Sequence, residues 1–220
     1  MVNVVKRRLY TITPPPGIDL EKVFERISEE LRIPYAEISY SKGKLYVELV
    51  GTEAQMRETW ARLRNVIAEL WGLYGLRIRG EAPIDVLVRE AGRTFPPEAL
   101  VYALELRGYK AEIDNGILRT TASADTVIEL ARRIGEIIDE LKYRVKGTAI
   151  KRLVAAVAAG LDVDVDKVLE FGLKMRVFEE NEEGKIELRE EWRRALRKLA
   201  VMLKPHSRVG MYGETEDKES

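Results

Sequence analysis

Residues 30–38 read ELRIPYAEI and residues 105–113 read ELRGYKAEI, so that six of the nine positions are identical. Each copy lies where an amphipathic, helix-like pattern gives way to alternating apolar and polar residues, which indicate a strand. A glycine turn follows each copy, at Gly43 and at Gly116, and then a second strand and a long amphipathic helix. Self-similarity of this kind predicts a repeated structural unit. We therefore expect an α+β fold built from repeated (β)α-β-β-α modules.

Residues 1–75 form the first of three modules predicted around these copies, and this module reads β-α-β-β-α. Its first strand, at 4–12, stops before three consecutive prolines, which cannot donate the hydrogen bonds of a sheet. Asp19 is a suitable N-cap for the first helix. Thr52 and Gln55 have the spacing of a capping box at the start of the second helix.

Residues 76–146 form the second module, which reads β-α-α-β-β-α. Alternation from position 76 to position 79 predicts a short strand, in which Arg77 and Arg79 share one face of a sheet. Asn115 and Gly116 predict a tight hairpin turn between the last two strands of the module.

Residues 147–204 form the third module, an α-α-β-β-α segment, and residues 205–220 form a polar, acidic tail that we expect to be disordered. Only two helices precede its hairpin, and the acidic turn at 179–183 repels phosphate, so a winged DNA-binding domain is disfavoured. An Asp-x-Asp-x-Asp string at 162–166 is better explained by helix capping than by a calcium loop, because Lys167 replaces the required glycine.

The composition of the chain excludes several chemistries. Among its 220 residues are 37 basic and 37 acidic side chains, no cysteine and a single histidine, His206. Disulfides, thiolate metal sites and histidine-based acid–base catalysis therefore lose their usual residues. Since nucleotide-binding loops and nucleophile elbows are also absent from the sequence, we expect no enzymatic activity and no cofactor.

The sequence also indicates where the protein works. It has neither a secretory signal pattern nor an apolar stretch long enough for a membrane helix, so we expect a cytoplasmic protein that is not attached to a membrane. Charged residues make up 34% of the chain, whereas glutamine occurs once and asparagine four times. This composition favours a hyperthermophilic source over the alternative, a mesophilic protein with a charge-rich surface.

The order of elements in the second module resembles a K-homology (KH) type I domain. That resemblance implies RNA binding, with a Gly-x-x-Gly loop between the first two helices that holds the nucleic-acid backbone. The corresponding loop in this sequence is Gly92-Arg93-Thr94-Phe95. Gly92 matches the first glycine and Arg93 offers a cation for phosphate, whereas Phe95 replaces the second glycine. The loop thus departs from the pattern at the position where a missing Cβ lets phosphate approach.

A literal Gly-x-x-Gly sequence occurs at residues 72–75, and we interpret it as a helix end and linker, since glycine often ends helices. The whole chain is also similar to a family of small proteins of unknown function from thermophilic archaea. That similarity implies no activity.

A run of five cations joins the second module to the third, with no acidic residue between its first and last members: Lys142, Arg144, Lys146, Lys151 and Arg152. One interpretation is a surface that contacts RNA phosphates, with Tyr143 stacking on a base. The other is a solvated linker whose cations complement the dipole of the preceding helix, 124–141. Arg77 and Arg79 become stronger RNA candidates if they lie beside Arg93.

Three further cations, Lys6, Arg7 and Arg8, lie on the first strand. They could contact RNA, but cations on an edge strand also protect it from pairing with other chains.

We therefore expect a non-catalytic RNA-binding protein that uses the KH-like module and the adjacent basic run. The alternative is a scaffold or assembly factor that binds another protein and no nucleic acid.

Overall fold

The chain has an α+β fold, as expected, in a computed structural model that describes residues 5–31 and 35–204. It divides into two compact units, Met1–Arg93 with Lys110–Glu129, and Thr94–Tyr109 with Leu130–Ser220. The boundaries of these units differ from those of the three predicted modules, so the modules stay a prediction drawn from the repeated sequence. The predicted disorder of the tail concerns residues outside the described part of the chain.

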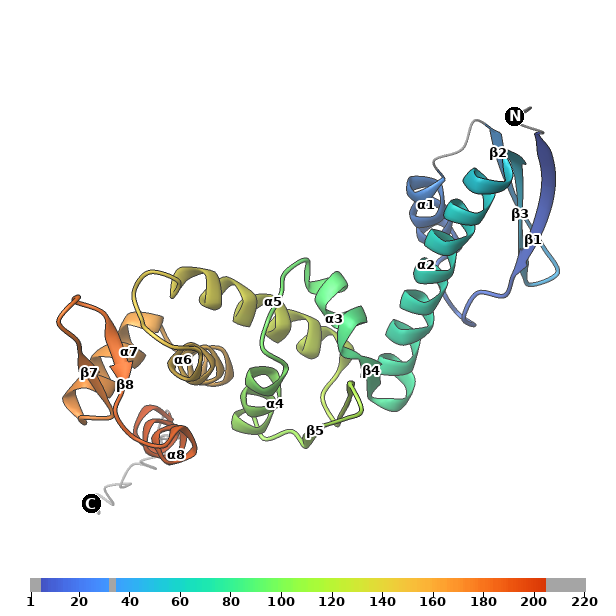
Figure 1. The fold of residues 1–220 in the computed structure, drawn as a ribbon. Helices are drawn as coiled ribbons and strands as arrows, with labels where there is room; N and C mark the ends of the chain where they lie inside the picture. The colour runs from blue at the N-terminus through green and yellow to red at the C-terminus, as the bar shows by residue number, and fades with distance from the viewer. Residues whose placement is uncertain (1–4, 32–34, 205–220) are drawn as a thin grey trace, which may run out of the picture. The chain divides into compact units, whose positions relative to one another are not determined.

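The first unit begins with a three-stranded antiparallel sheet in the order β1-β3-β2. Its strands are β1 (Lys6–Ile12), β2 (Tyr35–Ser41) and β3 (Lys44–Gly51), and Figure 1 shows α1 (Leu20–Glu30) and α2 (Glu53–Arg79) on one side of it. Alternate residues of β3 are fully buried on that side, where they join apolar residues of both helices in one core. The predicted caps are confirmed: Asp19 accepts from the Glu21 N–H at 3.1 Å, and Thr52 and Gln55 form a capping box.

A second antiparallel sheet, in the order β4-β6-β5, also lies in the first unit. It consists of β4 (Glu81–Pro83), β5 (Ala111–Asp114) and β6 (Ile117–Thr120), and α3 (Ile84–Ala91) follows β4. In both sheets the second strand of the hairpin is central. Ala36, Glu37 and Ile38 in β2 have the same pattern of burial as their echoes in β5. The strand residues of the two copies therefore occupy equivalent places in their sheets, whereas residues 105–109 of the second copy belong to the second unit and residues 30–31 of the first copy belong to the first.

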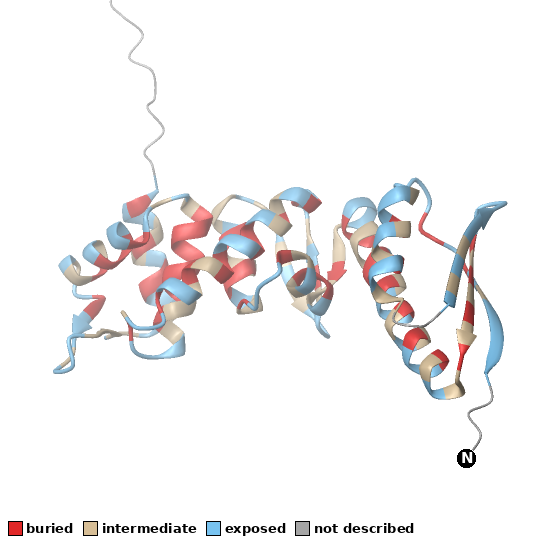
Figure 2. Ribbon diagram, turned by 90° about the horizontal axis from the view of Figure 1, so that it is seen from above, coloured by how far each residue is buried: buried red, intermediate tan, exposed pale blue. Residues whose placement is uncertain are grey.

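The second unit is mainly helical. Its core surrounds α6 (Thr148–Leu161), in which every residue from 153 to 160 is buried (Figure 2). Gly160 lies against the backbone of Ala103, so that α6 packs closely on α4 (Pro97–Leu106). The other elements are α7 (Val165–Lys174), β7 (Phe178–Glu180), β8 (Ile186–Leu188) and α8 (Trp192–Leu203). Helix α5 (Ala124–Glu140) begins in the first unit and continues into the second.

Two predicted elements are wrong. Residues 76–79 form the last turn of α2 and not a strand, and Gly72 and Gly75 lie inside that helix and do not end it. They provide space there for other parts of the unit, because a Cβ on Gly72 would meet Val86 at 2.9 Å. The helix ends instead at Gly80, whose φ of 70° is left-handed.

Candidate nucleic-acid interface

The basic run between α5 and α6 is largely neutralised by carboxylates from elsewhere in the second unit. Arg144 forms ion pairs with Glu140, at 2.7 Å, and with Asp166 of α7. The hydrogen bond to Asp166, which outweighs the opposing effect of desolvation, raises the pKa of Arg144. Lys146 lies 3.7 Å from Glu187 and 3.9 Å from Glu183. Any RNA phosphate would have to compete with these carboxylates.

The remaining residues of the run also have structural surroundings. Arg152 pairs with Glu98 and so links α6 to α4. Lys142 lies over the ring of Tyr143, with its Nζ 5.4 Å from the ring centroid, and Lys151 is half-buried on α6. These contacts agree better with a structural role for the run than with a phosphate-contacting surface.

The loop Gly92-Arg93-Thr94-Phe95 matches the Gly-x-x-Gly pattern only at its first glycine. Gly92 caps α3 with a left-handed φ of 68°, and a Cβ built on it meets nothing within 4 Å. Arg93 is exposed at the end of the first segment of the first unit. Phe95, which replaces the second glycine, is only 3% exposed. An apolar anchor therefore occupies the position at which the KH pattern opens the backbone to phosphate.

Arg77 and Arg79 extend from the last turn of α2, and both are exposed. Within the described part of the chain, neither guanidinium forms a hydrogen bond or an ion pair. Both line an open hollow of about 640 Å³, together with the segment from Thr120 to Asp125 that leads into α5. The hollow thus presents two available guanidinium groups, several hydroxyl groups and a single carboxylate, that of Asp125.

A second hollow, of about 380 Å³, lies beside the first and shares Arg79, Thr120 and Thr121 with it. Lys110 lines this second hollow. Its backbone is held at both ends, since the Lys110 N–H donates to Thr121 Oγ1 at 3.0 Å and Thr120 Oγ1 donates to the Lys110 carbonyl at 2.8 Å. Among the residues described, the Lys110 ammonium has no carboxylate partner.

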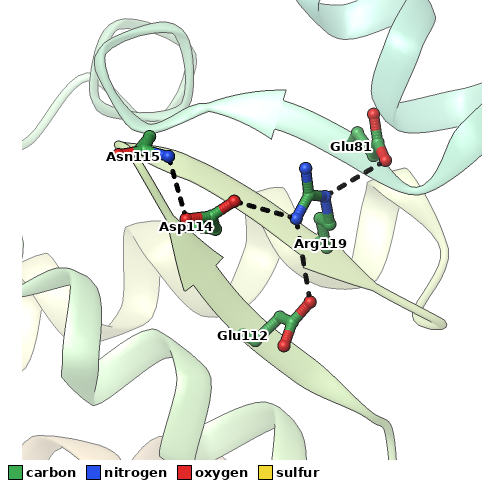
Figure 3. A network of polar contacts seen from close by, with 5 residues as sticks. All are labelled: Glu81, Glu112, Asp114, Asn115 and Arg119. Carbon is green, nitrogen blue, oxygen red and sulfur yellow. Dashed lines mark hydrogen bonds and ion pairs between the residues drawn. The ribbon is translucent and has the colours of Figure 1, made fainter.

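Arg119, on β6, contributes little free charge to this second hollow. Figure 3 shows its guanidinium between Glu81 of β4 and Glu112 and Asp114 of β5, at N–O distances of 3.3, 3.9 and 3.1 Å. The hydrogen bond and charge of Asp114 are the main causes that raise the pKa of Arg119. Arg119 therefore ties the three strands together across the sheet.

Among the cations that line the two hollows, Arg77, Arg79 and Lys110 have no carboxylate partner in the described part of the chain, and we call these three residues the cation surface. Sequence reasoning identified the two arginines but missed Lys110. The signal was present in the echo, because Lys110 occupies the position that corresponds to Tyr35 in the first copy. Replacement of an aromatic residue by a cation is a difference between copies that points to a separate role.

The cations of the first strand are paired within their own unit. Lys6 and Arg8 each lie 3.1 Å from Glu53, at the start of α2, and Arg7 donates to Glu48 of β3 at 2.8 Å. These ion pairs connect the edge strand β1 to β3 and α2.

The described residues provide neither a candidate metal-binding cluster nor a helix long and apolar enough to cross a membrane. The aspartate string has a structural explanation, since Asp164 caps α7 by accepting from the Asp166 N–H at 2.7 Å.

Comparison with known proteins gives one match. A sequence model of the family described as "Uncharacterized protein conserved in archaea (DUF2067)" matches residues 12–197, which include segments of both compact units. No curated protein and no solved structure matches the chain.

Proposed function

Since the chain belongs to this family of uncharacterised archaeal proteins, whose description assigns no activity, we propose a function from its own residues. The protein binds RNA without catalysing a reaction, and the cation surface of Arg77, Arg79 and Lys110 contacts the phosphates. The observation that carries the proposal is that these three unpaired cations line two adjoining hollows. Many other cations of the first unit are held by carboxylates.

The hollows give these cations a suitable setting. The three cations line the same hollows as Thr121, whose hydroxyl group accepts from the Lys110 N–H and keeps its own proton to donate to a phosphate oxygen. Lysine and arginine contacts to phosphate release counterions, and this release drives salt-dependent binding.

The element order supports the same proposal. Strand β4, helices α3 and α4, strands β5 and β6, and helix α5 follow one another in the order of a KH type I domain. Because buried Phe95 replaces the second glycine of the loop, we assign the contacts with the RNA backbone to the cation surface and not to that loop.

The direct test is a titration of fluorescently labelled RNA with the full chain, at low and at physiological salt. We expect micromolar or tighter binding at about 50 mM salt that weakens steeply as salt is added. Changing Arg77, Arg79 and Lys110 together to alanine should remove about three phosphate contacts. The slope of log affinity against log salt should then fall by about 2.

The matched control changes three exposed lysines to alanine: Lys22 and Lys44 in the first unit and Lys167 in the second. It alters the net charge by the same amount as the first triple variant does. It should leave the slope close to that of the wild type. Equal losses in the two triple variants, or no binding at low salt, would contradict the proposal. The scaffold alternative would then be preferred, and the exposed apolar Val201 and Met202 on α8 would be its first candidate contacts.

A further inference from the structure

The C-terminal part of α2 carries exposed aromatic and apolar side chains without any acidic residue. Residues 70–80 read LWGLYGLRIRG. Trp71 is 41% exposed and Ile78 is 65% exposed, although both are large and apolar. A tryptophan kept at the surface of a helix is an unusual use of that residue, since it normally contributes buried area.

The three apolar side chains lie along one side of the helix. Trp71, Tyr74 and Ile78 are separated by steps of three and four residues, which brings them together on an α-helix. The rings of Trp71 and Tyr74 form an edge-to-face pair, with centroids 5.7 Å apart and an interplanar angle of 83°. Each ring thereby orients the other.

The neighbouring side of the same helix is occupied by other elements of the unit. A Cβ on Gly75 would lie 2.9 Å from the Glu81 carbonyl oxygen, and Gly72 is close to Val86 of α3. The two glycines therefore face β4 and α3, whereas Trp71 remains accessible. We call Trp71, Tyr74 and Ile78 the aromatic stripe.

The charge around the stripe selects the class of ligand. Arg77 and Arg79 lie in the same turns of the helix, and residues 70–80 contain no carboxylate. A second copy of the chain is a poor occupant, because two such helices would bring four arginines together without an acid between them. A flexible polyanion that carries flat rings fits both the exposed aromatic side chains and the neighbouring arginines.

We propose that the aromatic stripe stacks on unpaired bases of single-stranded RNA, whose phosphates contact the adjacent cation surface. This inference rests on the proposed RNA-binding function and adds to it the class of RNA. Bases in a duplex are already stacked on one another and cannot reach Trp71, whereas unpaired bases can. Stacking on an aromatic ring tolerates any base, so little sequence preference is expected.

The test compares a single-stranded oligouridylate with a hairpin duplex that has the same number of phosphates, both titrated against the full chain. We expect tighter binding of the single strand, accompanied by a change in tryptophan fluorescence. The Trp71→Ala variant should lose about tenfold in affinity for the single strand and much less for the duplex. Trp71→Phe, which retains a ring and the apolar packing, should restore most of that loss.

Tyr143→Ala is the matched control, because Tyr143 is an aromatic residue that is 77% exposed beside the basic run. It should bind both RNAs as the wild type does. If the single strand and the duplex bind equally and Trp71→Ala changes neither, the stacking inference is wrong, while a loss in the Arg77, Arg79 and Lys110 variant would still uphold RNA binding. If the wild type binds neither RNA at low salt, both proposals are wrong.

Discussion

Gly80 is the residue that lets the chain turn from α2 into the second sheet. Its φ of 70° lies in the left-handed region, and its N–H donates to the Leu76 carbonyl at 3.1 Å. A Cβ at this position would lie 2.1 Å from the Thr120 carbonyl oxygen. Thr120 also donates a hydrogen bond from its hydroxyl group to the Lys110 carbonyl. The close contact between Gly80 and Thr120 therefore helps to position the cation surface.

Gly80→Ala should therefore destabilise the protein more than an ordinary glycine replacement. The comparison is Gly43→Ala, because Gly43 has a similar φ of 76° but open space around it. The control should cost about 1–2 kcal/mol for the left-handed backbone alone. Gly80→Ala should cost about 1–3 kcal/mol more, because of the clash. Denaturant unfolding of both variants measures the difference, and equal losses would refute the structural role of the close contact.

The fate of the basic run shows why part of the candidate site could not be predicted from the sequence. Local sequence shows five cations without an acid among them. Their partners come from distant segments: Asp166 lies 22 residues from Arg144, and Glu98 lies 54 residues from Arg152. Only the fold brings these groups together, so that three of the five cations, Arg144, Lys146 and Arg152, form ion pairs.

At the scale of elements, most helices and strands could be predicted because their signals are local. Caps at Asp19 and Thr52 and the turn at Asn115 each depend on neighbouring residues. The continuation of α2 through residue 79 could not be predicted in this way, since Leu76 and Ile78 alternate with arginines as they would in a strand. The helix continues there because Leu76 is buried in the fold and because Gly72 and Gly75 make room for other elements.

Glu53 joins two elements, because it accepts from Lys6 and Arg8 of β1 at the start of α2. The hydrogen bond from Lys6, and then the charge of Arg8, lower the pKa of Glu53. The folded protein therefore holds this proton less tightly than the unfolded chain does. The stabilisation is present above the ordinary carboxyl pKa of about 4.3 and is lost as the pH falls below it.

Glu53→Gln should accordingly lower the unfolding temperature at pH 6 and have a smaller effect at about pH 3, because the stabilisation declines as the pH falls from the ordinary carboxyl pKa towards the lowered pKa of Glu53 in the folded protein. Glu29→Gln serves as the control, since Glu29 is an exposed glutamate on α1. It should give the wild-type profile throughout. Thermal unfolding at the two pH values measures the effect, and a difference between Glu53→Gln and wild type that does not change with pH would disprove the charged contact. High salt should reduce the difference.

At the scale of the whole molecule, the sequence echo corresponds to two sheets of the same strand order. The resemblance to an archaeal family of unknown function is confirmed, while a thermophilic source stays a prediction. RNA binding and the KH-like character of the second module also stay proposals. The division into two compact units could not be predicted from the echo, because it depends on which helices share a core: α4 follows a segment of the first unit in sequence but packs on α6.

The measurement that tests the central claim most directly is hydrogen–deuterium exchange of the full chain with and without single-stranded RNA. With RNA bound, we predict slower amide exchange in peptides that cover residues 71–80 and 110–121, which carry the aromatic stripe and the cation surface. Peptides that cover residues 142–152 should exchange as they do without RNA, because Arg144, Lys146 and Arg152 are already paired with carboxylates. Protection of residues 142–152, with no change at 71–80 and 110–121, would contradict this prediction.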